Sequence, residues 1–321
     1  SKKGVNIFEG HNKENIENCD LLVYSSAVNN KNVELIEAKK NQIPIVRRAE
    51  MLGELLKLKS TSIAVSGTHG KTSTTSMMGS ILTESMLDPT LIIGGVVKNL
   101  NANALLGKGD IIVAEADEFD KSFLQLAPTH SIITNIDSEH LDCYGSKENL
   151  IEAFNQFANS TAFYGSVVLC IDDPFLKRII PNITRPILTY GFSRDAEFQA
   201  VNRKFRDCRS FFDVLHKGKL LGSIELGVPG AHNIKNALAT IALANELEIK
   251  FELIKKGLKN YSGVKRRFEI KGKVNETIII DDYAHHPTEV TATLKAIKNG
   301  WNKRVIAIFQ PHLFSRTREF F

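Results

Sequence analysis

SIAVSGTHGKTSTT, residues 62–75, decides the fold class of this chain. Its apolar start predicts a strand, GTHGKT (67–72) predicts a glycine-rich loop, and the residues that follow predict a helix. A strand, such a loop and a helix N-terminus bring backbone N–H groups and the positive end of a helix dipole together, which favours a phosphate. The usual pattern has a glycine where Val65 stands. Because Gly67 and Gly70 still permit a tight turn, we expect a phosphate-binding loop rather than an ordinary strand-to-helix turn.

The residues of this loop have the chemistry that a nucleoside triphosphate requires. Lys71 is placed to reach the β- and γ-phosphates, and the hydroxyl of Thr72 is placed to ligate Mg²⁺. We therefore expect ATP contacts from the whole loop, which comprises Gly67, Thr68, His69, Gly70, Lys71, Thr72 and Ser73.

The bulk composition is that of an ordinary globular protein, with 43% hydrophobic and 24% charged residues among 321. No apolar run approaches the roughly 18 residues of a membrane span. The net charge of +5 is mild, and no basic stripe with interleaved aromatic residues indicates nucleic-acid binding. The four cysteines form no C-x-x-C pair, which argues against a zinc site and a disulfide framework. We expect a cytoplasmic protein without a nucleic-acid or membrane partner; the sequence does not give the oligomeric state.

Strand and helix signals alternate on both sides of the loop, which is typical of α/β domains with a parallel sheet. Before the loop, the sequence predicts strands at 21–26 and 43–46 and helices at 32–40 and 49–58. After it, the sequence predicts helices at 72–85 and 146–159 and strands at 91–95, 111–117, 131–137 and 167–172. Residues 196–228 predict a β-hairpin around HKGK, and a long helix at 233–247 follows. A further unit begins with a strand at 277–281, a helix at 287–298 and a strand at 304–309.

Acidic residues and a histidine follow two of these strands. EADEFD (115–120) and TNIDSEHLD (134–142) stand where strands end, and ligand sites of open α/β sheets lie at those ends. Carboxylates near a triphosphate suit a divalent cation. For His140, which shares its loop with three acids, a metal or phosphate role and a structural role are both open. The alternative for the acids is a solvated turn.

Polar residues also mark the start of the long helix and the segment near residue 265. Asn233 and Asn236 lie three apart on one helical face, where they are placed to bond a nucleotide. N-capping would explain Asn233 alone. GVKRRFE (263–269) offers two arginines that match phosphate oxygens, with a surface basic pair as the alternative.

The last two motifs repeat the pattern of polar residues after a strand. DDYAHHPTE (281–289) combines acids, a tyrosine and two histidines ahead of a helix that opens with proline, which favours a site. QPHLFSR (310–316) follows the next predicted strand and offers His312 and Arg316 for a carboxylate.

Together these motifs resemble the Mur ligases. The likeness spans nearly the whole chain. It rests on the motifs GTHGKTSTT, EADE.D.SFLQL.P, TNID.EH.D.YG, HN..NA, GV.RRFE, DDYAHHP and FQPH..SR.R, and also on GH...NI, VYSSAV, IPIVRRAEML and GG.VK. The resemblance implies a three-domain α/β architecture. Residues 1–58 would be the C-terminal part of a Rossmann-like UDP-sugar-binding domain, and 59–262 a central P-loop ATPase domain with a parallel sheet. Residues 263–321 would begin a Rossmann-like domain for the amino acid.

The resemblance also implies a reaction of peptidoglycan precursor synthesis. ATP would phosphorylate the lactyl carboxylate of UDP-N-acetylmuramate, and the amine of L-alanine would attack the acyl phosphate. The implied catalytic residues are Lys71, Glu115, His140 and Arg267. Asn233, Asn236, Arg267 and Asp282 would join the loop in binding ATP, and Thr72, Glu115 and His140 would hold Mg²⁺. The amino acid would meet Tyr283, His286, His312 and Arg316, although the family commonly has arginine where this chain has Leu313.

Other functions stay open at this point. A recycling ligase of the same family would join a preformed tripeptide to the same sugar nucleotide, but SFLQLAP and DCYG favour the alanine enzyme. A non-ligating P-loop module would not need acid and histidine clusters at three further strand ends. The chain begins without methionine and stops at RTREFF, just after a strand signal, so we expect missing sequence at both ends.

Overall fold

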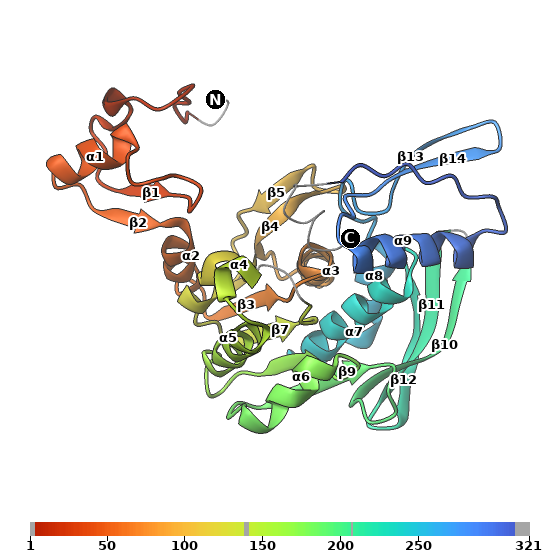
Figure 1. Ribbon diagram of the computed structural model, residues 1–321. Coiled ribbons are helices and arrows are strands. Elements are labelled where there is room, and N and C mark those ends of the chain that lie inside the picture. Colours follow the sequence, from red (N-terminus) through yellow and green to blue (C-terminus); the bar gives the residue numbers. More distant parts are fainter. Residues whose placement is uncertain (1–3, 138–140, 207, 312–321) are drawn as a thin grey trace.

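The centre of the molecule is a ten-stranded mixed sheet (Figure 1). The computed structural model describes residues 4–137, 141–206 and 208–311, without the side chains of residues 141 and 142. The strand order is β12-β11-β10-β9-β8-β7-β3-β6-β4-β5. The bounds are β3 (Thr61–Ser66), β4 (Thr90–Val97), β5 (Ala102–Leu105), β6 (Ile111–Glu115), β7 (His130–Ile133), β8 (Val167–Cys170), β9 (Ile187–Gly191), β10 (Phe198–Arg206), β11 (Arg209–His216) and β12 (Lys219–Leu226).

The strands from β4 to β10 in this order pair in parallel, and only the two edges are antiparallel. The α/β fold class expected from the sequence is confirmed, but the expected parallel sheet gains β5 on one edge and the β11–β12 hairpin on the other. Strand β3 is central because Ile63, Ala64 and Val65 are buried on both faces, as parallel sheets require.

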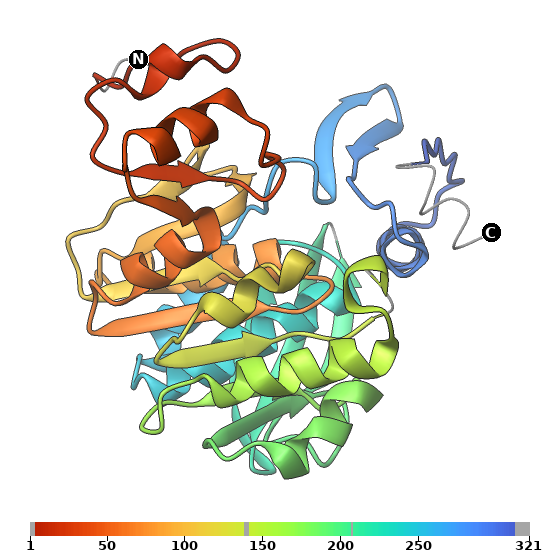
Figure 2. The ribbon, with the colours of Figure 1, turned by 60° about the vertical axis from the view of Figure 1, so that its left-hand side comes forward.

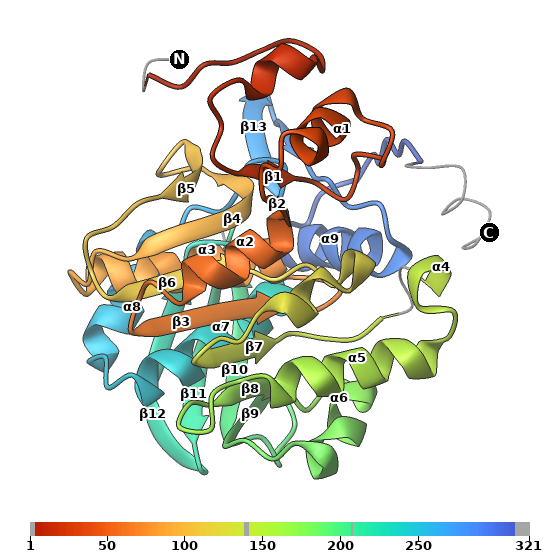
Figure 3. The same ribbon diagram turned by 90° about the vertical axis from the view of Figure 1, so that its left-hand side faces the viewer.

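Helices cover both faces of the sheet (Figure 3). On one face lie α3 (Lys71–Glu84), α7 (Ala231–Glu246) and α8 (Phe251–Asn260), which pack against each other. On the other face lie α2 (Arg48–Leu56), α5 (Lys147–Asn159) and α6 (Pro174–Ile179), with the shorter helix α4 (Leu141–Tyr144) and the 3-10 helices η2 (Phe119–Gln125) and η3 (Ile180–Asn182). Between η2 and α5, Phe123 stacks on Phe157 and meets Phe154 edge to face; all three are fully buried and form a core on this side of the sheet.

The N-terminal segment forms a small lobe that projects from the central body (Figure 2). It contains η1 (Lys13–Ile16), β1 (Leu22–Tyr24), α1 (Val33–Lys40) and β2 (Ile45–Arg47), and the two strands pair in parallel. Several of its apolar side chains, among them Ile7, Phe8 and Ile36, are exposed, because a two-stranded sheet has too little surface to cover them.

The C-terminal segment contains a hairpin of β13 (Glu269–Val274) and β14 (Thr277–Asp281), followed by α9 (Pro287–Gly300). Helix α9 packs against α7 and β10. The strand expected at 304–309 is wrong: these residues form no strand, and Ile306 and Ile308 are 72% and 98% exposed. The reason is that, within the described residues, β14 pairs only with β13 and no sheet offers this segment a neighbour.

Among the described residues, no helix combines the length and apolar character that crossing a membrane would require.

Candidate active site

The glycine-rich loop lies between β3 and α3, and its two glycines have conformations that other residues rarely adopt. Gly67 has φ of 128° and Gly70 has φ of 87°. A Cβ on Gly70 would lie 2.6 Å from Oδ1 of Asn236, so both the backbone conformation and the packing require glycine at this position. Val65, in contrast, is a fully buried β3 residue in register with Glu115. The glycine of the usual pattern is not needed there because the chain is still an extended strand at that position.

The segment after β7 holds the loop in place. The amide of Asn135 donates to the His69 carbonyl and its Oδ1 accepts from the His69 N–H, both at 2.9 Å. The Thr134 hydroxyl donates to the same carbonyl at 2.6 Å, and the Asp137 N–H donates to the Thr68 hydroxyl at 2.8 Å. From the sequence we expected a metal or phosphate role for this segment, and we did not predict that Thr134 and Asn135 hold the loop by hydrogen bonds. The pairing of β3 with β7 places the ends of both strands side by side, which is the feature that could have predicted these contacts.

Lys71 is bound to a carboxylate that the sequence prediction did not single out. Its Nζ donates to the Gly67 carbonyl at 2.8 Å and to Oε2 of Glu118 at 2.6 Å. Both side chains are largely buried. Burial raises the pKa of the Glu118 carboxyl to about 7 against the opposing charge of Lys71. Burial lowers the pKa of Lys71, but the charges of Glu118 and Asp117 outweigh it and leave this pKa raised.

Thr72 and Glu115 meet at the start of α3 and the end of β6. The Thr72 hydroxyl donates to Oε1 of Glu115 at 3.0 Å, and the Gly94 N–H donates to Oε2 at 2.7 Å. A hydroxyl and a carboxylate beside a phosphate-binding loop are oxygen donors of the kind that Mg²⁺ prefers, so the two residues fit that ion. His140, the other predicted metal ligand, lies outside the described residues.

A cleft of about 590 Å³ runs from the loop along the start of α7 towards the C-terminal segment. Besides loop residues, its lining includes the four ATP-binding residues that were predicted outside the loop, namely Asn233, Asn236, Arg267 and Asp282. The N-cap of α7 is Gly230, so capping does not explain Asn233, whose amide donates instead to the Pro229 carbonyl at 2.7 Å. A volume of this size is in the range of small-molecule sites.

Glu289, in the first turn of α9, connects the C-terminal segment to the loop and was also missed. Nη1 of Arg267 donates to its Oε1 at 3.0 Å, and Nδ1 of His69 lies 3.5 Å from the same oxygen. Burial alone would raise the pKa of Glu289, but the hydrogen bond from His69 and the charge of Arg267 hold it well below the usual range. Asp282 accepts hydrogen bonds from the Phe268 N–H at 3.2 Å and from the Thr293 hydroxyl at 2.8 Å.

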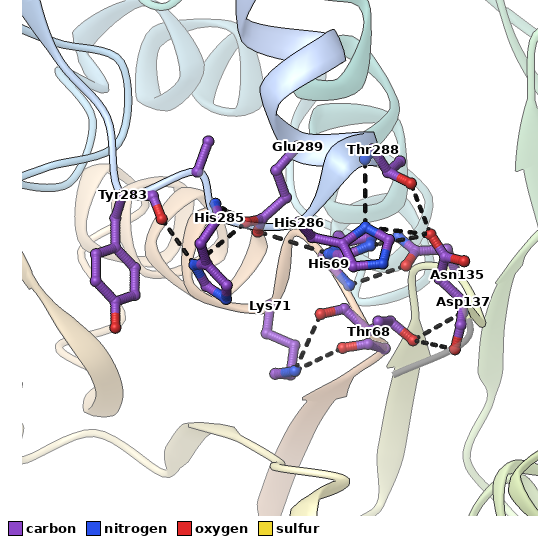
Figure 4. A network of polar contacts seen from close by, with 12 residues as sticks. Thr68, His69, Lys71, Asn135, Asp137, Tyr283, His285, His286, Thr288 and Glu289 are labelled. Atoms are coloured by element: carbon purple, nitrogen blue, oxygen red, sulfur yellow. Dashed lines mark hydrogen bonds and ion pairs between the residues drawn. The ribbon is translucent and has the colours of Figure 1, made fainter. Parts of the chain in front are cut away.

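Two of the four residues that were expected to surround the amino acid are described, and they lie in different surroundings (Figure 4). Tyr283 is partly exposed and does not line the cleft, whereas His286 is buried against His69 with ring centroids 4.8 Å apart. His312 and Arg316 lie outside the described residues.

Comparison with known proteins gives consistent results along the chain. Residues 1–60 match the description "Mur ligase family, catalytic domain", residues 65–244 match "Mur ligase middle domain", and residues 266–321 match "Mur ligase, glutamate ligase domain". The chain is 48% identical over 321 residues to UDP-N-acetylmuramate–L-alanine ligase of Syntrophus aciditrophicus, covering 100% of this chain and 67% of that protein. The ligase of the same name from Salinibacter ruber is 47% identical over 320 residues, with 99% and 67% covered.

Solved structures resemble the chain in fold. UDP-N-acetylmuramate-alanine ligase from Thermotoga maritima superposes with a TM-score of 0.82 at 31% identity, covering 93% of this chain and 68% of that one. A murein peptide ligase from Psychrobacter arcticus superposes with a TM-score of 0.74 at 26% identity, covering 92% and 67%. The chain thus spans about two thirds of the length of these relatives.

Proposed function

This chain belongs to the Mur ligase family, and from that membership we propose that it is the ATP-dependent ligase that joins L-alanine to UDP-N-acetylmuramate. The identity of 48% to a ligase of that name, over the whole chain, carries the assignment of substrates. The reaction belongs to the synthesis of peptidoglycan precursors, which we place in the cytoplasm.

The three-domain α/β fold of the family gives each part of the chain a role. We propose that residues 1–58 belong to the domain that binds the UDP sugar, 59–262 to the ATPase domain, and 263–321 to the domain that receives the amino acid. The position of Arg267 and Glu289 against the glycine-rich loop supports this division, because it brings the third part of the chain to the ATP site.

ATP would lie in the cleft with its phosphates on the loop from Gly67 to Ser73. Backbone N–H groups and the α3 dipole favour the anion there. Lys71 would leave Glu118 for the β- and γ-phosphates, and Asn233, Asn236, Arg267 and Asp282 would line the rest of the nucleotide.

Thr72 and Glu115 are the residues that would hold Mg²⁺, with His140 as the proposed ligand of a second ion. When bound, Mg²⁺ reduces the repulsion between the triphosphate and an anionic acceptor. The hydrogen bond from the Gly94 N–H holds the Glu115 carboxylate in a single orientation beside the loop.

The chemistry proceeds in two steps. A carboxylate oxygen of the sugar nucleotide attacks the γ-phosphorus, the bond to the bridging oxygen breaks, and ADP leaves. Lys71 stabilises the charge on the transferring group. The amine of L-alanine then attacks the acyl carbon, the carbon–oxygen bond to phosphate breaks, and the amine loses its proton. We propose that Tyr283, His286, His312 and Arg316 form the site for the amino acid.

The acceptor is tested by measuring ADP release with UDP-N-acetylmuramate and either L-alanine or a peptidoglycan tripeptide. We expect release with L-alanine and at most slow release with the tripeptide. Turnover with the tripeptide alone would assign the protein to the recycling ligases instead.

A further inference from the structure

Two histidines and an aspartate from three segments meet beside the glycine-rich loop (Figure 4). Nε2 of His69 lies 3.2 Å from Oδ2 of Asp137, and Nδ1 of His286 lies 3.7 Å from the same oxygen. One ligand atom from each of the three residues lies within 4.8 Å of the other two. The segments are the loop before α3, the loop after β7 and the N-cap of α9.

A second layer of contacts orients these side chains. Glu289 lies 3.5 Å from Nδ1 of His69, on the side of the ring opposite Asp137. A neutral His69 that donates its Nδ1–H to Glu289 turns the Nε2 lone pair towards Asp137. The Thr288 hydroxyl donates to Oδ2 of Asp137 at 2.8 Å. Histidines that bind a metal commonly donate their other ring N–H to a carboxylate, and carboxylates that bind a metal commonly accept a hydrogen bond from a neighbouring group.

The polar atoms of the three side chains point into one small space. Nε2 of His69 lies 3.2 Å from Oδ2 of Asp137, and in the tautomer that is protonated at Nδ1 this nitrogen carries a lone pair. Nδ1 of His286 accepts from the Thr288 N–H at 3.2 Å, so it also carries a lone pair. Two imidazole nitrogens and a carboxylate oxygen are donor atoms that bind a metal cation.

We propose that His69, Asp137 and His286 form a binding site for a divalent transition-metal ion of the Zn²⁺ class. Two imidazoles and one carboxylate are a ligand set that suits Zn²⁺ and leaves one position of a tetrahedron open. The absence of a C-x-x-C pair argues only against a zinc site built from cysteines, and the three residues proposed here include no cysteine. Its residues also differ from Thr72 and Glu115, and its occupancy does not depend on the proposed ligase reaction.

Metal bound at these residues would connect α9 to the glycine-rich loop, because His286 begins α9 and His69 belongs to the loop. The ion would take the place of the hydrogen bond that Nδ1 of His286 accepts from the Thr288 N–H. We therefore expect Zn²⁺ to raise the melting temperature of the protein in the absence of nucleotide.

The test is equilibrium dialysis of the nucleotide-free protein with Zn²⁺ alone, with Co²⁺ absorption as a report on ligand number. The informative variant is His286→Asn, because asparagine still caps a helix but offers no imidazole. We expect the wild type to bind Zn²⁺ and this variant to lose both the site and the zinc-dependent rise in melting temperature. Glu289→Gln keeps the size of the side chain that orients His69 but removes its charge, and it should weaken binding roughly 10–100-fold.

Two controls separate this site from its neighbours. His285→Asn removes the adjacent histidine, and Glu115→Gln removes the proposed Mg²⁺ ligand; both should keep the site. The proposal is overturned if the wild type binds no Zn²⁺, if His286→Asn binds it as the wild type does, or if only Glu115→Gln abolishes binding.

Discussion

At the residue scale, the contact between Lys71 and Glu118 explains how the loop keeps a buried cation when no phosphate is bound. The carboxylate takes the place of an anionic ligand at 2.6 Å from Nζ. A buried ammonium without such a partner would be costly, so Glu118 offsets part of the cost of burying Lys71.

Replacement of Lys71 tests the role of this cation in turnover. Lys71→Ala should lower kcat by at least about 10²–10³-fold, because the charge that stabilises the transferring phosphoryl group is lost. Circular dichroism should show an intact fold. Near-normal ADP release by a folded Lys71→Ala protein would refute the assignment of the loop.

The raised pKa of Glu118 gives a prediction for stability. Its folded-state pKa of about 7 lies above the ordinary value of 4.5, so the folded protein keeps a proton that the unfolded chain loses first. The contribution of Glu118 to stability therefore falls as pH rises from about 4.5 to about 7. Urea unfolding of the wild type and Glu118→Gln across this range should show the variant gaining relative stability with rising pH. A relative loss would contradict the burial argument.

At the element scale, the turn from β3 into α3 depends on glycine. Gly70→Ala places a Cβ 2.6 Å from Oδ1 of Asn236 at a φ of 87°, so it should destabilise the protein by about 1–2 kcal/mol and weaken ATP binding. Gly300→Ala is the matched control, because a Cβ there meets no atom within 4 Å. It should leave stability unchanged or raise it by about 0.4–1 kcal/mol. Equal unfolding free energies for both variants would disprove the account of the turn.

The elements around the loop could be predicted because each has a strong local signal. Strand β3 is a short apolar run, α3 follows a glycine pair, and the hairpin at 217 and 218 has two residues with positive φ. The conformations of β5 and of the segment at 304–309 could not be predicted. Whether such a segment forms a strand depends on a neighbouring strand, which local sequence does not reveal. The pairing of Thr72 with Glu115 followed from the resemblance to the Mur ligases. The contacts of Lys71 with Glu118 and of His69 with Glu289 join distant segments and were not predicted.

At the scale of the whole molecule, residues from two parts of the chain line the proposed ATP site. Arg267 and Glu289 come from the C-terminal segment and contact each other, and Glu289 also contacts His69 of the glycine-rich loop. Glu289→Gln removes the charge that binds Arg267, so we expect the KM for ATP to rise more than kcat falls. Steady-state kinetics measures the two changes separately. An unchanged KM for ATP would argue against a role of the contact between Arg267 and Glu289 in nucleotide binding.

The most direct test of the central claim follows the carboxylate oxygen of the sugar nucleotide. UDP-N-acetylmuramate labelled with heavy oxygen in its lactyl carboxylate is incubated with the protein, ATP, Mg²⁺ and L-alanine, and the released phosphate is analysed by mass spectrometry. Transfer through an acyl phosphate predicts one labelled oxygen in each phosphate released. Unlabelled phosphate, formed while the alanine product accumulates, would contradict the account.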